Sequence, residues 1–236
     1  MLKAIIFDFD GVIVDSEPLH FRAFARVAEP LGVTFDYQHY LKHLIGYDDR
    51  DAGRIMLAQA AGAGANARPE DYRGDERRIA AFREEKGRVF EQIVREGVPT
   101  IPGVVRLIEE AGAQMPIAVC SGATRADIDL ILSGIKLNAT FKTIVSADDV
   151  ARSKPDPACY ALAVERLARM HPALRLAPGD CLAIEDTAAG IASARGAGLQ
   201  TLGLLTTSPR SELHRAQRVV ENLEGVSVGQ LRAWYC

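Results

Sequence analysis

The stretch FDFDGVIVDSE at residues 7–17 closes a short apolar run with two aspartates that stand two positions apart. Gly11 favours a turn at this point, and the turn lets the chain fold Asp8 and Asp10 toward one place, where their like charges repel. Either aspartate alone would be an ordinary cap or turn residue. The pair gains meaning only if other parts of the chain bring partners to the same place.

Four further apolar runs have the same form, and helical patterns separate them. Short, continuous apolar strands that alternate with helices predict an α/β fold with a doubly wound, Rossmann-like parallel sheet. The carboxyl ends of such strands border one crevice, so the polar residues that close the runs should converge there. The five runs are KAIIFD at 3–8, MPIAVCS at 115–121, FKTIVSADD at 141–149, DCLAIED at 180–186 and LQTLGLLTT at 199–207.

Residues 17–92 interrupt this alternation, because they contain helical patterns and a Gly/Ala-rich loop around 61–69 but no convincing strand. We therefore expect a smaller helical cap domain at 17–92, inserted after the first strand of a core domain formed by 1–16 and 93–236. Within the core, Ser208 followed by a proline predicts the start of a helix.

The composition excludes several classes of function. A net charge of −3 over 236 residues, 48% of them hydrophobic, indicates a folded protein that binds neither nucleic acid nor an anionic membrane surface. No apolar run approaches the roughly 20 residues that cross a bilayer, and the first residues lack a secretory signal, so we expect a cytoplasmic protein. The sequence does not indicate an oligomeric state. The four cysteines match no zinc pattern and are expected as reduced thiols: Cys120, Cys159, Cys181 and Cys236.

Two more acids, Glu185 and Asp186, close the run DCLAIED. Together with Asp8 and Asp10 they would place four carboxylates at neighbouring strand ends. Buried like charges at this density need a cation. Oxygen ligands of this kind suit Mg²⁺, which keeps several waters and commonly shares a phosphate of the substrate.

Two other strand ends are suited to an anion. Ser121 and Gly122 follow an apolar run and precede a helix, whose N-terminus attracts negative charge. Lys154 lies in SKPDP, where two prolines stiffen the backbone. Ser121 alone could be a turn residue, and Lys154 alone a surface lysine. Combined with four acids, they predict a site for phosphoryl transfer.

The segments DFDGVIVDSE, VCSGAT, SKPDP and AIEDTAAG, in this order and spacing, resemble the four signature motifs of the haloacid dehalogenase superfamily. The resemblance covers nearly the whole chain. It is greatest to the subgroup with a helical cap, which includes β-phosphoglucomutase and small sugar-phosphate phosphatases. The resemblance is specific for the superfamily and much less so for the substrate.

The resemblance implies a role for each motif residue. Asp8 would be the nucleophile that forms an aspartyl-phosphate, and Asp10 the general acid and base. Ser121 and Lys154, with Gly122, would bind the phosphoryl group.

The same resemblance implies a Mg²⁺ site. Asp8, Asp186 and the main-chain carbonyl of Asp10 would bind the ion, with Glu185 in or beside its coordination shell.

Three residues of the predicted cap resemble substrate-facing positions of the subgroup. His20 follows DSEPL, Arg50 lies in GYDDRD and Lys86 lies in REEKGRVF. His20 is equally well explained as an ordinary helix histidine, and Arg50 and Lys86 as solvated basic side chains. The Gly/Ala-rich loop is longer than the subgroup's pattern, which weakens any finer prediction of the substrate.

We therefore expect a Mg²⁺-dependent phosphatase that hydrolyses a small phosphorylated metabolite, and in particular a sugar phosphate. A phosphomutase of the β-phosphoglucomutase kind is the alternative, because the same residues serve both reactions. A catalytically inactive binding protein on the same fold is a remote third. Asp10 argues against dehalogenation, since a halide leaving group needs no proton.

Overall fold

A computed structural model describes residues 1–45 and 47–235 of the chain. Its contacts divide the chain into two units, one formed by Met1–Asp15 and the chain from Pro99 onward, the other by Ser16–Val98. We refer to them as the core and the helical unit. The helical unit extends to residue 98 rather than 92, because its last helix, α4 (Glu76–Glu96), continues past that point.

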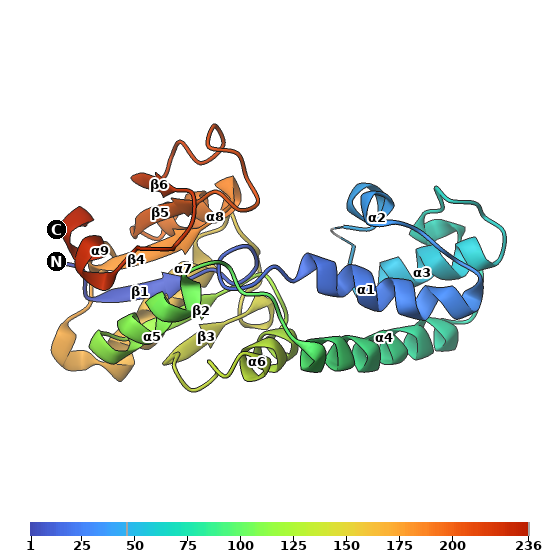
Figure 1. Cartoon of the computed structure of the whole chain (residues 1–236), viewed down its shortest axis with the longest axis horizontal. Helices are drawn as coiled ribbons and strands as arrows, with labels where there is room; N and C mark the ends of the chain where they lie inside the picture. Colours follow the sequence, from blue (N-terminus) through green and yellow to red (C-terminus); the bar gives the residue numbers. More distant parts are fainter. Residues whose placement is uncertain (46, 236) are drawn as a thin grey trace. The chain divides into compact units, whose positions relative to one another are not determined.

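A six-stranded parallel sheet forms the centre of the core (Figure 1), in the order β3-β2-β1-β4-β5-β6. This confirms the doubly wound α/β fold. The sixth strand was not predicted, because it is short, lies at the edge of the sheet and begins with an arginine. The strands are β1 (Ala4–Phe7), β2 (Ile117–Cys120), β3 (Thr143–Val145), β4 (Cys181–Glu185), β5 (Gln200–Leu204) and β6 (Arg218–Val220).

β1 lies between β2 and β4, with Ile5 opposite Ile117 on one side and Leu182 on the other. All residues of these three strands are buried, as expected for a sheet that helices cover on both faces. The strands are parallel, so their last residues lie along one edge of the sheet. This register places the ends of β1, β2 and β4 next to one another.

Helices cover both faces of the sheet. α7 (Ala158–Met170) contacts β2 and β3, and α8 (Ala188–Gly196) contacts β4, β5 and α7, so both cover one face. Right-handed crossovers place α5 (Val104–Gln114) and α6 (Arg125–Gly134) on the other face. The last helix, α9 (Val228–Trp234), packs against α5.

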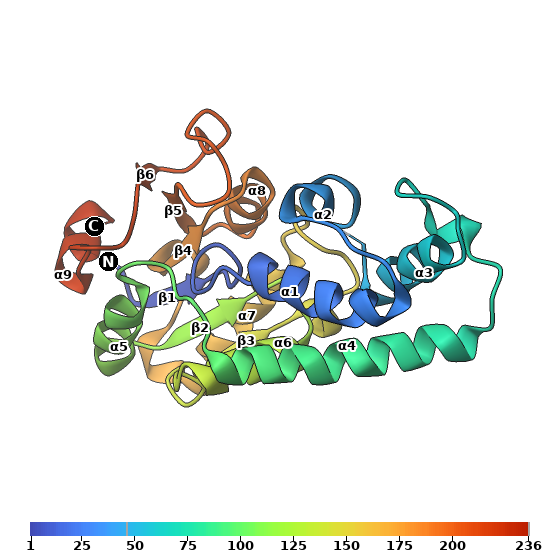
Figure 2. The same cartoon turned by 45° about the vertical axis from the view of Figure 1, so that its right-hand side comes forward.

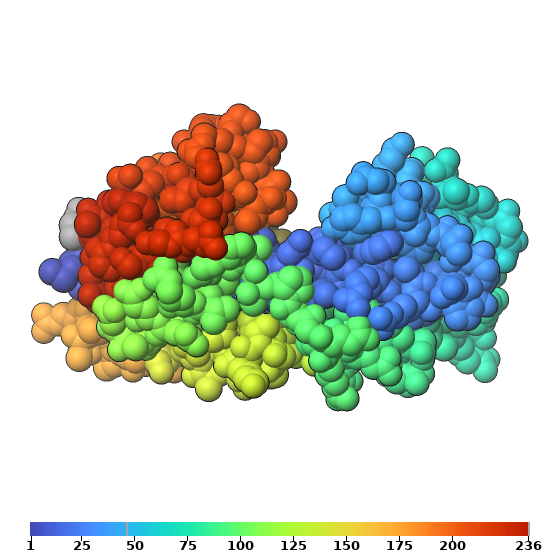
Figure 3. Space-filling view, viewed as in Figure 1, coloured from blue at the N-terminus to red at the C-terminus, as the bar shows by residue number. Residues whose placement is uncertain are grey.

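The predicted helix at Ser208 is absent. Residues 205–217 form a loop of turns between β5 and β6, drawn in orange-red at the surface of the core in Figure 3. Ser208 donates its backbone N–H to the main-chain oxygen of Asp186 over 3.3 Å. The segment that follows forms separate turns instead of a helix: Glu212 donates its backbone N–H to Pro209, and Ala216 donates to Leu213, both over 2.9 Å.

The expectation of reduced thiols is wrong for one pair, because a disulfide joins Cys120 and Cys159. Cys120 is the last residue of β2, and Cys159 lies in the first turn of α7. Their Cα atoms are 6.1 Å apart, within the range of disulfides. Packing of α7 on β2 brings them together over a sequence separation of 39 residues, which spacing alone did not reveal.

The described residues of the helical unit contain no strand. α1 runs side by side with α4 (Figure 2), and α3 contacts α4 as well. The apolar positions of α4 recur every three or four residues, and its Ile79 and Phe82 join Phe24 of α1 in the core of this unit. The helices are α1 (Glu17–Ala28), α2 (Tyr37–His43), α3 (Asp49–Ala60) and α4, with 3-10 turns at Glu29–Leu31 and Pro69–Asp71.

Within the described chain, no helix is both long and apolar enough to cross a membrane.

Candidate active site

Asp8 follows the last residue of β1 and is 8% exposed. Its backbone N–H still donates to Ile184 of β4 over 3.0 Å, which fixes the main chain at this point. Phe9 donates its backbone N–H to Asp8 Oδ1 over 2.7 Å. Gly11 then makes the predicted turn with a φ of +74°, and a Cβ at Gly11 would overlap the Asp186 carboxylate. Glycine is therefore required both by the turn and by the close approach of the acid.

Asp8, Glu185 and Asp186 form a buried acidic group in which one oxygen from each lies within 4.8 Å of the others. Glu185 ends β4, and Asp186 follows it. Asp186 Oδ1 is buried and has no hydrogen-bond partner among the described atoms. A buried carboxylate oxygen of this kind is suited to a cation.

Asp10 is half-buried and lies in the turn that follows β1, where it pairs with Val14. Its side chain is not part of the acidic group. Its expected contribution to metal binding, through the main-chain carbonyl, stays a prediction.

Burial disfavours the ionised form of these acids. Burial and the nearby Glu185 raise the pKa of Asp8 well above its usual range, although Lys154 opposes the shift. Burial also raises the pKa of Asp186 to about 6, against the hydrogen bond from Thr207. A divalent cation at the acidic group would relieve both penalties, so the residues present fit the Mg²⁺ that the sequence predicts.

Lys154 supplies positive charge to this group. Its Nζ lies 2.8 Å from Asp8 Oδ1 and 2.7 Å from Glu185 Oε1, and it donates to the carbonyl of Cys120 over 2.9 Å. Burial alone would lower the pKa of Lys154, but Asp8 and Glu185 raise it above the usual value. The ammonium therefore stays charged and has three acceptors for its three hydrogens. The sequence predicted Lys154 at this place as a phosphate-binding residue, but not its two carboxylate partners.

Ser121 lies where β2 ends and is 2% exposed. Its Oγ accepts the backbone N–H of Ala123 over 2.9 Å, which closes a turn before α6. Gly122 is exposed within this turn. The first backbone N–H of α6, from Arg125, donates to the Asp148 side chain over 2.9 Å. The predicted anion site at this helix start therefore depends on the turn at 121–123 rather than on that amide.

Thr206 and Thr207, which follow the end of β5, were not predicted as site residues. Thr206 Oγ1 donates to the carbonyl of Gly11 over 2.5 Å and lies 3.3 Å from Asp186 Oδ2, and Thr207 also donates to Asp186. They hold the Asp186 carboxylate against the turn after β1. The signal was present, because the run LQTLGLLTT ends in hydroxyl residues at the same sheet edge as the acids.

Lys86 and His20 come together within the helical unit. Lys86 is 2% exposed, and its Nζ lies 3.0 Å from His20 Nδ1 and 2.8 Å from Asp49 Oδ1. The rings of Phe24 and Phe90 lie 5.0 and 4.9 Å from the same Nζ. Burial and Lys86 lower the pKa of His20 to about 4, so this imidazole is neutral near neutral pH. Asp49 was not predicted, because a lysine's partner on another helix is set by packing.

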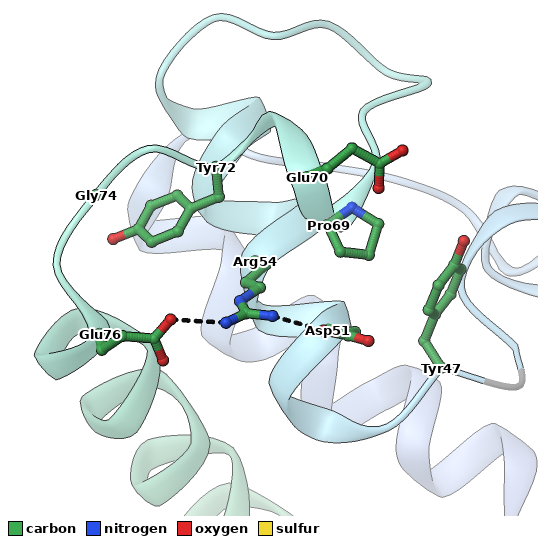
Figure 4. Close-up of a pocket in the computed structure, with 8 residues that line it drawn as sticks. All are labelled: Tyr47, Asp51, Arg54, Pro69, Glu70, Tyr72, Gly74 and Glu76. Atoms are coloured by element: carbon green, nitrogen blue, oxygen red, sulfur yellow. Dashed lines mark hydrogen bonds and ion pairs between the residues drawn. The ribbon is translucent and has the colours of Figure 1, made fainter.

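Arg50 does not join this cluster. Its guanidinium lies 2.9 Å from the Glu76 carboxylate, and its side chain is 51% exposed. Figure 4 shows the neighbouring hollow of the helical unit, where Arg54 lies between Asp51 and Glu76. Tyr47 and Tyr72 flank this hollow on opposite sides. It is lined only by residues of the helical unit, none of which the sequence predicted as catalytic.

We predict that Asp186→Asn stabilises the metal-free protein by on the order of 2 kcal/mol near pH 7. Burial raises the pKa of Asp186 from 3.8 to about 6, so the folded protein binds more protons than the unfolded chain between these values. Stability is therefore lost as the pH rises through this window. The loss of stability is complete above about pH 6 and absent below about pH 4. Urea unfolding in a chelator at both extremes measures the difference.

Addition of Mg²⁺ near neutral pH should stabilise the unsubstituted protein and leave Asp186→Asn nearly unchanged, since binding to the folded state alone raises stability. Equal stability of the two proteins without metal, or an equal response to Mg²⁺, would contradict the assignment.

Most of the chain is similar to proteins that have been named. The sequence matches the haloacid dehalogenase-like hydrolase family over residues 5–204. It is 28% identical to the phosphorylated carbohydrates phosphatase of Thermotoga maritima, over 85% of this chain and 84% of that protein. It is 29% identical to β-phosphoglucomutase of Bacillus subtilis, over 86% of this chain and 83% of that protein.

The fold matches the crystal structure of CbbY from Rhodobacter sphaeroides in complex with phosphate, with a TM-score of 0.72 and 26% identity. That match covers 98% of this chain and 100% of the other. The chain belongs to the haloacid dehalogenase-like hydrolase family.

Proposed function

We propose that the protein is a Mg²⁺-dependent phosphatase that hydrolyses the phosphate ester of a small metabolite, in particular a sugar phosphate. The observation that carries this proposal is the ammonium of Lys154, which lies between Asp8 and Glu185 at the edge of a buried acidic group. Phosphoryl transfer requires a nucleophile, such as a carboxylate, and positive charge for the phosphoryl group, which here a fixed ammonium and a site for a metal ion would supply at one place.

Asp8 is the proposed nucleophile. Its Oδ1 accepts from the backbone of Phe9 and from Lys154, so Oδ2 is the oxygen placed to attack. A bond forms between Oδ2 and phosphorus as the bond between phosphorus and the leaving oxygen breaks. Asp10 gives its proton to that oxygen and releases the alcohol.

The aspartyl-phosphate is then hydrolysed. Asp10, now ionised, takes a proton from water as the water oxygen attacks phosphorus. The bond from phosphorus to Asp8 breaks, which releases phosphate and regenerates both carboxyl groups. Lys154 and Ser121 would hold the phosphoryl oxygens during both steps, and Lys154 can do so by exchanging one of its three present acceptors.

Asp8, Asp186 and the main-chain carbonyl of Asp10 would hold the Mg²⁺, with Glu185 beside them. When bound there, the ion supplies neutralisation of the charge on the transferring phosphoryl group.

The relatives support a carbohydrate phosphate as the substrate, since one is a phosphatase of phosphorylated carbohydrates. The same relationship leaves the phosphomutase as the alternative, since another is β-phosphoglucomutase.

His20 and Lys86 are the residues that we propose for recognition of the sugar, with Asp49 as a third member. A neutral imidazole, an ammonium and a carboxylate together donate and accept hydrogen bonds, as sugar hydroxyls require. Arg50 is a weaker candidate, because Glu76 neutralises it.

We predict that the protein with Mg²⁺ releases inorganic phosphate from at least one member of a panel of sugar phosphates and other small phosphate esters. Asp8→Asn should lower the rate by about a thousandfold or more, since it removes the nucleophile. No release from any ester would refute the phosphatase, and undiminished turnover by Asp8→Asn would refute the nucleophile. Conversion of β-glucose 1-phosphate to glucose 6-phosphate, in the presence of a bisphosphate primer and without phosphate release, would establish the mutase. If the protein shows neither phosphatase nor mutase activity, this result would indicate the inactive binding protein.

We predict that Lys86→Met lowers kcat/KM for the preferred sugar phosphate about tenfold, because it removes a charged donor. Hydrolysis of p-nitrophenyl phosphate, which has no hydroxyls to recognise, should change by less than about twofold. Lys42→Met, which removes an exposed lysine of α2, is the control. Equal losses on both substrates would show that Lys86 supports the fold rather than recognition.

A further inference from the structure

We propose that Tyr160 is a positioning residue of this site, whose hydroxyl fixes the Glu185 carboxylate so that Glu185 holds Lys154 against Asp8. This inference rests on the function proposed above and adds a residue outside the four motifs. Tyr160 lies in the first turn of α7, the helix that packs on β2 and β3.

The Tyr160 side chain is fully buried among small apolar residues of the sheet, including Ala118 and Ala183. A phenol hydroxyl in such surroundings needs a hydrogen-bond partner. Its partner is Glu185 Oε1, at 2.6 Å. The hydroxyl is the donor of this bond, because it carries the hydrogen and an ionised carboxylate only accepts.

Three side-chain contacts and the nearby backbone of α8 constrain the Glu185 carboxylate. Oε1 accepts from both Tyr160 and Lys154, at 2.6 and 2.7 Å, and Oε2 lies 3.3 Å from Thr187 Oγ1. The backbone of α8 also passes close to the carboxylate at Gly190, where a Cβ would overlap it. The carboxylate therefore cannot rotate without breaking a short hydrogen bond in a buried environment.

Tyr160 also contacts Lys154 directly. The ammonium lies 5.1 Å from the centroid of the tyrosine ring, within the range of a cation–π interaction. One side chain thus touches the ammonium through its ring and the ammonium's carboxylate partner through its hydroxyl. The position of the ammonium in turn affects Asp8, because Lys154 Nζ lies 2.8 Å from Asp8 Oδ1.

Phenylalanine would fill the same space and keep the ring beside Lys154, so packing alone does not explain the hydroxyl. Without it, Glu185 Oε1 would keep only Lys154 of its two donors and could turn away from its present orientation. The ammonium would follow its partner and lose its alignment with the transferring phosphoryl group. The hydroxyl is thus the part of Tyr160 that acts on the reaction.

The test compares Tyr160→Phe with Tyr235→Phe. Tyr235 is a matched control, because it is a buried tyrosine of the same unit, 4% exposed, whose hydroxyl donates to the carbonyl of Thr201 over 3.0 Å. Each substitution removes one buried hydroxyl and keeps the ring. Circular dichroism and urea unfolding check that both variants fold. Steady-state kinetics with a phosphate ester and calorimetric binding of inorganic phosphate in the presence of Mg²⁺ are then measured.

We expect Tyr160→Phe to lower kcat about tenfold, to raise KM several-fold and to weaken phosphate binding by a similar factor, because Lys154 would meet the phosphoryl group of the bound ester as well as that of the transition state. Tyr235→Phe should leave all three within about twofold of the unsubstituted protein. Similar values for the two variants would overturn the positioning role. If the unsubstituted protein hydrolyses no ester, the proposed function fails, and phosphate binding alone decides the role of Tyr160. Undiminished phosphate binding by Tyr160→Phe, or none by the unsubstituted protein, would then overturn it.

Discussion

A largely buried ammonium between two buried carboxylates is the interaction on which the rest of the site depends. Asp8 and Glu185 would be costly to ionise in this environment without Lys154, which lies within 2.8 Å of both. Burial raises the pKa of Asp8, and Lys154 opposes that rise, so it favours the ionised form that can attack phosphorus. Asp186 keeps an unpartnered buried oxygen at the same place. The lysine, the acids and the proposed Mg²⁺ thus balance one another's charge.

The fold was largely predictable, because each strand of a covered parallel sheet is a continuous apolar run with its own polar ending. The exceptions have physical causes. The edge strand Arg218–Val220 has only three residues and lies between Gln217 and Glu221, so it does not stand out from a loop. Ser208 and the proline after it are typical of a helix start, but the backbone beyond them forms separate turns, in which Glu212 donates to Pro209 and Ala216 to Leu213. The disulfide of Cys120 with Cys159 depends on how α7 packs, which no local pattern contains.

The site was predictable where its residues end strands, since parallel topology alone brings Asp8, Glu185 and Asp186 to one edge. It was not predictable where a partner comes from the side of a helix. Tyr160 has the pattern of a core residue, and only the direction of its hydroxyl distinguishes it. In the helical unit, Asp49 was missed for the same reason, because it meets Lys86 only through packing of separate helices. The ion pair of Arg50 with Glu76 likewise joins two helices.

The central claim is that Asp8 carries the phosphoryl group between substrate and water. Mass spectrometry of protein quenched in acid during turnover of a phosphate ester with Mg²⁺ tests it most directly. The account predicts one added phosphoryl group on the peptide that contains Asp8, in its unsubstituted form and not in Asp8→Asn. A phosphoryl group on another residue, or none in a protein that is turning over, would contradict it.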